Sequence, residues 1–166
     1  TVIASDEHHS RLQCHGFELV VHQIPTHIAG AITIERPPKR RVSGAIRLDY
    51  PAPTVHSRNL FHLSAAMYDA WAAYDPHPQG YFVDEAAAAA DVEAARARAI
   101  SFAAYRILQF RFVEPRCSPG AAAYAATRFG ALMDTLGYDE EFIATAGGVD
   151  PPAELGNRIA AAVIAA

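Results

Sequence analysis

The sequence predicts an all-α fold, a partial helical bundle of about four helices that follows an irregular N-terminal arm. From about residue 45 the chain consists of Ala-rich, helix-favouring segments, and Pro, Gly and Asp separate them. Within these segments apolar residues recur at three- and four-residue spacing, as on the buried face of a helix. The 166 residues suffice for one core, and with 51% apolar residues the chain is too hydrophobic to be disordered.

Residues 1–43 differ from the rest, and we expect them to form an irregular or weakly ordered arm before a helical domain at 44–166. Their helical periodicity is poor, and a Pro/Arg-rich stretch, ERPPKRR, follows. The runs Phe17–Val21 and Ala31–Ile34 are compatible with short strands. Five of the eight histidines lie in this arm: His8, His9, His15, His22 and His27.

The first helix is predicted from Thr54, which serves as N-cap, to about Ala73, where Asp75-Pro76 stops it. At about 100° per residue, one face of this helix is apolar and is expected to face the core. That face contains Leu60, Leu63, Met67, Ala70, Trp71 and Tyr74, flanked by Phe61, Ser64 and Tyr68.

Three further helices follow from cap signals. Asp84 or Asp91 can cap the second helix, whose body we expect from Val92 to about Phe112. Ser118-Pro119 and Gly137 bracket a third helix at 119–136. Asp150-Pro151 opens a fourth helix, which reaches Ala166 without a stop signal, so we expect a cut within a longer protein and an apolar face that lacks a surface to cover it.

The charge and motif content exclude several classes of function. A net charge of −4 and a pI near 6.0 argue against a nucleic-acid partner, and the basic run at 36–41 is interpreted as solvated. No apolar run approaches the roughly 18 residues of a membrane span. Cys14 and Cys117 lack zinc-finger spacing, and no phosphate-binding glycine loop or serine-hydrolase motif occurs.

One polar cluster on the first helix is a candidate site. Arg58, His62 and Asp69 fall within a sector about 40° wide, but Asp69 lies two turns beyond His62, so a third element would have to bridge them. As a functional site, His62 would be a ligand or base and Asp69 would orient a partner. The alternative is a solvated face, or buried pairings that hold helices together.

A small metal-binding helical protein that uses His56, His62 and Asp69 is a further hypothesis. His56 and His62 are six residues apart, which separates them by about 120° on a helix. Metal-binding pairs prefer a spacing of three or four residues, so one helix does not bring these two histidines together.

Long stretches of the chain match a known family as strings. They include Ala45 to Asp75 (AIRLDYPAPTVHSRNLFHLSAAMYDAWAAYD), then GYFV, DVEAARARAISFAAYRIL, ALMDTLGYD and LGNRIAAAVIA. Over residues 45–166 the chain resembles the N-terminal helical region of bacterial vanadium-dependent haloperoxidase-like proteins, which are oxidoreductases related to the type 2 phosphatidic acid phosphatases. The resemblance implies a helical bundle that, at full length, holds vanadate as cofactor with Lys, Arg and backbone donors.

The motifs that bind vanadate in that family are absent from this chain. They are a Lys with six residues between it and Arg-Pro, then Pro-Ser-Gly-His, then Ser-Arg with a His six positions after the Arg. Near matches fail: Ala29 precedes Arg36-Pro37, Ala45 follows Ser43-Gly44, and Ser64 stands where Ser57-Arg58 requires His. No catalytic, cofactor-binding or metal-binding residue is therefore carried over, and no cofactor is expected in this chain.

These observations lead to one expected function and two alternatives. We expect an N-terminal fragment, inactive alone, that packs against a C-terminal catalytic bundle missing from the chain. The first alternative is a free-standing interaction or oligomerisation module, in which the apolar face of the fourth helix binds a partner or a second copy. The second is the metal-binding protein described above.

Overall fold

The computed structural model describes residues 9–14, 17–22, 44–113 and 118–166, and the side chains of the last two ranges. The chain divides into two compact units, Thr1–Glu35 and Arg36–Ala166. The division falls eight residues before the boundary at 43–44 expected from the sequence.

The described residues of the first unit form an antiparallel hairpin. Strand β1 (His9–Cys14) pairs with β2 (Phe17–His22), with His9 opposite His22 and Cys14 opposite Phe17. The β-compatible run at 17–21 therefore lies in a strand, where the sequence predicted an irregular arm. Its partner, HSRLQC, has little β-rich character, which is why the pairing was not predicted; the run at 31–34 lies outside the described residues.

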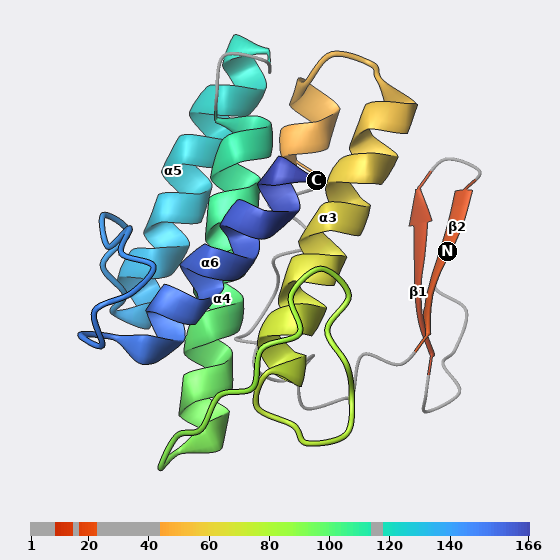
Figure 1. Cartoon of the computed structure of the whole chain (residues 1–166). Helices are drawn as coiled ribbons and strands as arrows, with labels where there is room; N and C mark the ends of the chain where they lie inside the picture. Colours follow the sequence, from red (N-terminus) through yellow and green to blue (C-terminus); the bar gives the residue numbers. More distant parts are fainter. Residues whose placement is uncertain (1–8, 15–16, 23–43, 114–117) are drawn as a thin grey trace. The chain divides into compact units, whose positions relative to one another are not determined.

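The second unit is helical, which confirms the predicted class for this part of the chain (Figure 1). A short helix at 44–48 precedes α3 (Pro53–Ala72), α4 (Val92–Phe112), α5 (Pro119–Leu136) and α6 (Pro151–Ala165). Helix α4 packs against α3, α5 and α6, and α6 also packs against α3. None of the described helices is long and apolar enough to cross a membrane.

Cap residues explain why three helices begin where the sequence predicted. The side chains of Asp91, Ser118 and Asp150 accept hydrogen bonds from backbone N–H groups in the first turns of α4, α5 and α6. Helix α5 ends at Gly137, whose φ of 67° is left-handed and favours glycine. The prediction of Thr54 as N-cap of α3 was wrong: the helix starts one residue earlier, at Pro53, whose fixed φ suits the first turn.

One hydrophobic cluster of the core lies between α4, α5 and the helix at 44–48, with Ala153 of α6. Its largest fully buried side chains include Phe102, Phe112 and Met133. Helices α4 and α6 approach closely at Gly156, where an added Cβ would lie 2.4 Å from the carbonyl oxygen of Ala99. Glycine is required at this crossing because any side chain would strike backbone.

The buried face of α3 differs from the predicted one. Ala70, Trp71 and Tyr74 are buried as expected, whereas Leu60, Leu63 and Met67 are only half-buried. The buried face of α3 instead includes four polar residues: His56, Asn59, His62 and Asp69. For Asp69 and His62 the reason is that hydrogen bonds with loop amides and with Arg111 compensate for the loss of water.

The apolar face of α6 is also covered, contrary to the prediction. Ile159 and Val163 have no exposed surface, because α4 and α3 supply the surface that the sequence did not reveal. The alternative of an interaction module assumed that this face is exposed, whereas its residues Ile159 and Val163 are buried within the chain.

Candidate functional site

Asp69 is fully buried and its carboxylate organises the loop that follows α3. Its Oδ1 accepts a hydrogen bond from the backbone N–H of Tyr81 at 2.6 Å, and its Oδ2 accepts from Phe82 and Val83 at 2.9 and 3.0 Å. Three amide donors replace the water that a buried carboxylate gives up. The role of Asp69 is therefore to hold the loop, and its partners are the backbone amides of residues 81–83.

His62 is paired with an arginine of α4. The Nη2 of Arg111 lies 2.7 Å from the imidazole Nδ1, and because arginine can only donate, Nδ1 is the acceptor. The proton of the neutral ring is therefore on Nε2. The rings of Phe61 and Phe82 flank the imidazole, with centroids 5.8 and 6.0 Å away.

The electrostatics around His62 favour its neutral form. Burial, followed by the positive charges of Arg111 and Arg58, lowers the pKa of His62 below its usual value. Arg58 itself is exposed. Of the three predicted site residues, Arg58 and His62 therefore act on one another through charge, whereas Asp69 is occupied with the loop.

His56 belongs to a separate junction. Its Nε2 lies 3.4 Å from Oδ2 of Asp49, whose Oδ1 accepts from the backbone N–H of Ser118 at 2.7 Å. The hydroxyl of Ser118 donates to the carbonyl oxygen of Leu48. Ser, His and Asp meet here, but the carboxylate lies in the middle and the hydroxyl does not reach the imidazole, so the arrangement of a hydrolytic triad is absent.

Two other buried polar groups hold the loop between α5 and α6. The carboxylate of Glu154 accepts from the backbone N–H groups of Gly148 and Val149, each at 3.0 Å. Asn157 donates to the carbonyl oxygens of Phe142 and Ala144, each at 2.9 Å. In the described part of the helical unit, no three His, Cys, Asp or Glu side chains form a group that could hold a metal ion.

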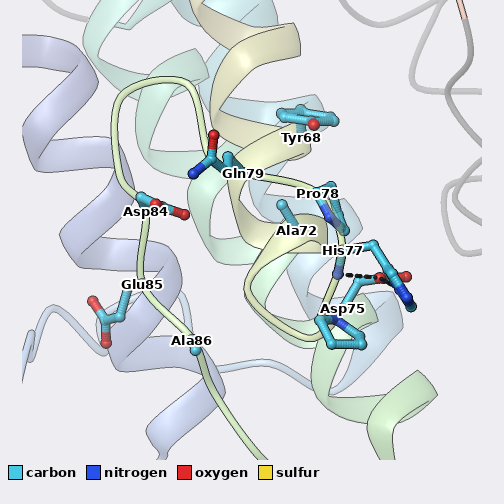
Figure 2. Close-up of a pocket in the computed structure, with 10 residues that line it drawn as sticks. Tyr68, Ala72, Asp75, His77, Pro78, Gln79, Asp84, Glu85 and Ala86 are labelled. Carbon is cyan, nitrogen blue, oxygen red and sulfur yellow. Dashed lines mark hydrogen bonds and ion pairs between the residues drawn. The ribbon is translucent and has the colours of Figure 1, made fainter.

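An open hollow of about 640 Å³ lies beside the loop at 75–86 (Figure 2). Its charges are largely paired: Asp75 with His77 and Arg96, and Glu85 with Arg158. Asp75 accepts a hydrogen bond from the backbone N–H of His77, and this bond lowers the pKa of Asp75. The hydrogen bond between Asp75 and the imidazole of His77 lowers this pKa by a smaller amount. The residues that line the hollow are Tyr68, Ala72, Asp75, Pro76, His77, Pro78, Gln79, Asp84, Glu85 and Ala86.

Several of these residues could not be identified from the sequence. Arg111, Asp49 and Glu154 find their partners across helices or at loop amides, and their spacing carries no signal of those contacts. The breaks at Asp75-Pro76 and Pro78 were the only sequence signal for the loop that lines the hollow.

Comparisons with known proteins add no relative. No family model matches the chain, and neither the curated proteins nor the solved structures contain a match.

Proposed function

We propose that this chain is the N-terminal structural part of a vanadium-dependent haloperoxidase-like protein, inactive alone, that packs against and shapes a catalytic bundle. The proposal rests first on the string resemblance over residues 45–166. The observation that supports it most is that Asp69, the acidic member of the candidate site, holds a loop by hydrogen bonds to backbone amides.

The same use of polar side chains recurs in the rest of the helical unit and supports a scaffold role. Glu154 anchors the turn before α6, and Asn157 anchors the loop at 142–144. Arg106 donates to the carbonyl oxygens of Glu140 and Phe142 at 2.7 and 2.8 Å. Each side chain fixes backbone that would otherwise leave polar groups without partners.

The test is the coding sequence that follows the Ala166 codon, together with an assay of two chain lengths. We expect an open frame with Pro-Ser-Gly-His and the Arg-to-His motif. The extended chain should oxidise bromide or chloride with peroxide in a vanadate-dependent way, and the 166-residue chain should not. Vanadate-dependent turnover by the 166-residue chain, or a downstream frame without these motifs, would contradict the proposal.

A further inference from the structure

The segment that leads into α4 has a sequence that favours a helix, yet it is not helical. Residues 84–91, the alanine strap, read DEAAAAAD, and alanine and glutamate are strong helix formers. In the structure they form neither helix nor strand. Exposure alternates along the strap, because Glu85, Ala87 and Ala89 are half-buried and the residues between them are exposed. This period of two is that of an extended chain.

The strap contains a second start signal for α4. At the observed start, the side chain of Asp91 accepts a hydrogen bond from the backbone N–H of Ala94, and Glu93 lies in the first turn. Asp84 stands seven positions before Asp91, again with an alanine three residues later and with Glu85 as the first helical residue. A helix that begins at Glu85 would therefore have the same kind of cap, and it would extend α4 by about two turns.

Three contacts keep the strap extended. The carboxylate of Asp69 holds the backbone amides of residues 81–83, immediately before the strap. Glu85 accepts two hydrogen bonds from Arg158 of α6, from Nε at 3.1 Å and from Nη2. The backbone N–H of Ala87 donates to the carbonyl oxygen of Ala73 at 2.7 Å.

The backbone of the strap is otherwise unpaired. Within the described part of the chain, the N–H groups of the other four alanines have no hydrogen-bond partner. A helix from Glu85 would pair the N–H groups of residues 88–90 with carbonyl oxygens four residues earlier, and Asp84 would cap the N–H of Ala87. The helical form therefore offers hydrogen bonds that the extended form lacks.

The extended and helical forms exclude one another. A helix rises about 1.5 Å per residue and an extended chain about 3.3 Å, so winding seven residues shortens the segment by about 12 Å. Asp69 fixes the chain before the strap, and α4 fixes the chain after it. Winding therefore requires residues 81–83 to leave Asp69 and Glu85 to leave Arg158.

We propose that the alanine strap is a conformational switch between this extended form and a two-turn N-terminal extension of α4. The strap supplies Asp84, Glu85 and Ala86 to the wall of the hollow beside the loop at 75–86 (Figure 2). The hollow in this form therefore exists only while the strap is extended. An anionic group that binds Arg158 in place of Glu85 would favour the helical form. The switch is independent of the proposed scaffold role, and either can fail without the other.

The experiment is NMR of the full chain, with the Cα chemical shifts of residues 86–90 as the signal and saturation transfer to detect a minor form. In the wild type we expect extended shifts in the major form and a helical minor form of about 1–10%. Glu85→Gln weakens the bond to Arg158 and keeps a good helix former, so it should raise the helical population about two- to fivefold. Glu141→Gln, at an exposed position outside the strap, is the control and should leave the population unchanged.

Two further variants distinguish a helix from a merely loosened strap. Asp69→Asn weakens the hold on residues 81–83 and should raise the helical population at least about fivefold. Ala88→Gly, combined with Asp69→Asn, lowers the helix propensity at the centre of the strap and should reduce that population about fourfold. Ala88 is exposed, so its replacement removes little packing.

Any one of three results would overturn the switch. The first is the absence of helical shifts in the wild type, Glu85→Gln and Asp69→Asn alike. The second is a strap with random-coil shifts in Asp69→Asn, which would show that the released segment does not wind. The third is a helical population that Ala88→Gly does not reduce.

Discussion

At the scale of single residues, buried carboxylates organise loops of the helical unit. Asp69 and Glu154 each accept hydrogen bonds from three consecutive backbone N–H groups, at 81–83 and at 148–150. Loop N–H groups that belong to no helix or strand lack regular backbone partners, and one carboxylate supplies several acceptors at once. Replacing the carboxylate should therefore unpair several groups together.

Asp69→Asn tests this role. The amide keeps the shape, but its NH₂ group would face a backbone donor, so at least one loop N–H loses its acceptor. We expect the free energy of unfolding to fall by about 2–4 kcal/mol, measured by urea denaturation. Asp134→Asn, at an exposed position of α5, is the control and should change it by less than about 0.5 kcal/mol. Equal effects of the two variants would contradict the role of Asp69.

His62 predicts a pH dependence of stability. Because its pKa is lowered in the folded state, the unfolded chain binds the proton first as the pH falls. The contribution of neutral His62 to stability is therefore full above the unfolded pKa of about 6.5, and it is lost progressively as the pH falls from there to the lower folded pKa. His62→Asn, whose amide oxygen can accept from Arg111, should show a smaller loss over this window. A steeper loss in the variant, measured by urea denaturation at several pH values, would be inconsistent with a lowered pKa.

At the scale of the elements, local signals predicted α4, α5 and α6 closely. Asp91, Ser118 and Asp150 each act within three residues of their own position, so the short sequence around them suffices to place the helix start. The face of α3 could not be predicted in this way. Its orientation depends on Asp69 and His62, whose partners are loop amides 12–14 residues away and an arginine of α4.

The candidate site shows the same division. The periodicity of the helix placed Arg58 and His62 one turn apart, as found, but Arg111, which completes the group, is 49 residues from His62. Similarly, the burial of α6 depends on the surfaces of α4 and α3, which do not appear in its own sequence. Contacts between elements therefore account for what sequence patterns missed.

The crossing of α4 and α6 allows a matched test with two glycines. Gly156→Ala would place a methyl group 2.4 Å from the backbone oxygen of Ala99 and 2.8 Å from Cβ of Phe102. The helices must then separate, and we expect a loss of about 1–3 kcal/mol in the free energy of unfolding. Gly120→Ala, in the first turn of α5 with no neighbour within 4 Å of the added Cβ, should be neutral or stabilising by up to about 1 kcal/mol. Thermal denaturation of both variants measures the difference, and a stable Gly156→Ala would contradict the close approach.

At the scale of the helical unit, α4 is the common partner of the other long helices. It packs against α3, α5 and α6, whereas α5 packs mainly against α4. Helix α6 is attached on two sides, to α4 and α3, and the side chains of Glu154 and Asn157 fix the loop before it. Separating α5 should therefore disrupt less buried surface than separating α6.

Native-state hydrogen exchange tests this order. We expect the amides of α5 to exchange through a partial opening at a lower free energy than those of α4 and α6, which require global unfolding. Phe129→Ala removes a buried ring of α5 and should cost about 3–5 kcal/mol locally, which accelerates exchange in α5 well beyond its effect on α6. Ile159→Ala, equally buried in α6, should accelerate exchange in α4 and α6 together. If α5 exchanges with the same free energy as α4 in the wild type, and both variants accelerate all helices equally, the unit unfolds as one and the order is wrong.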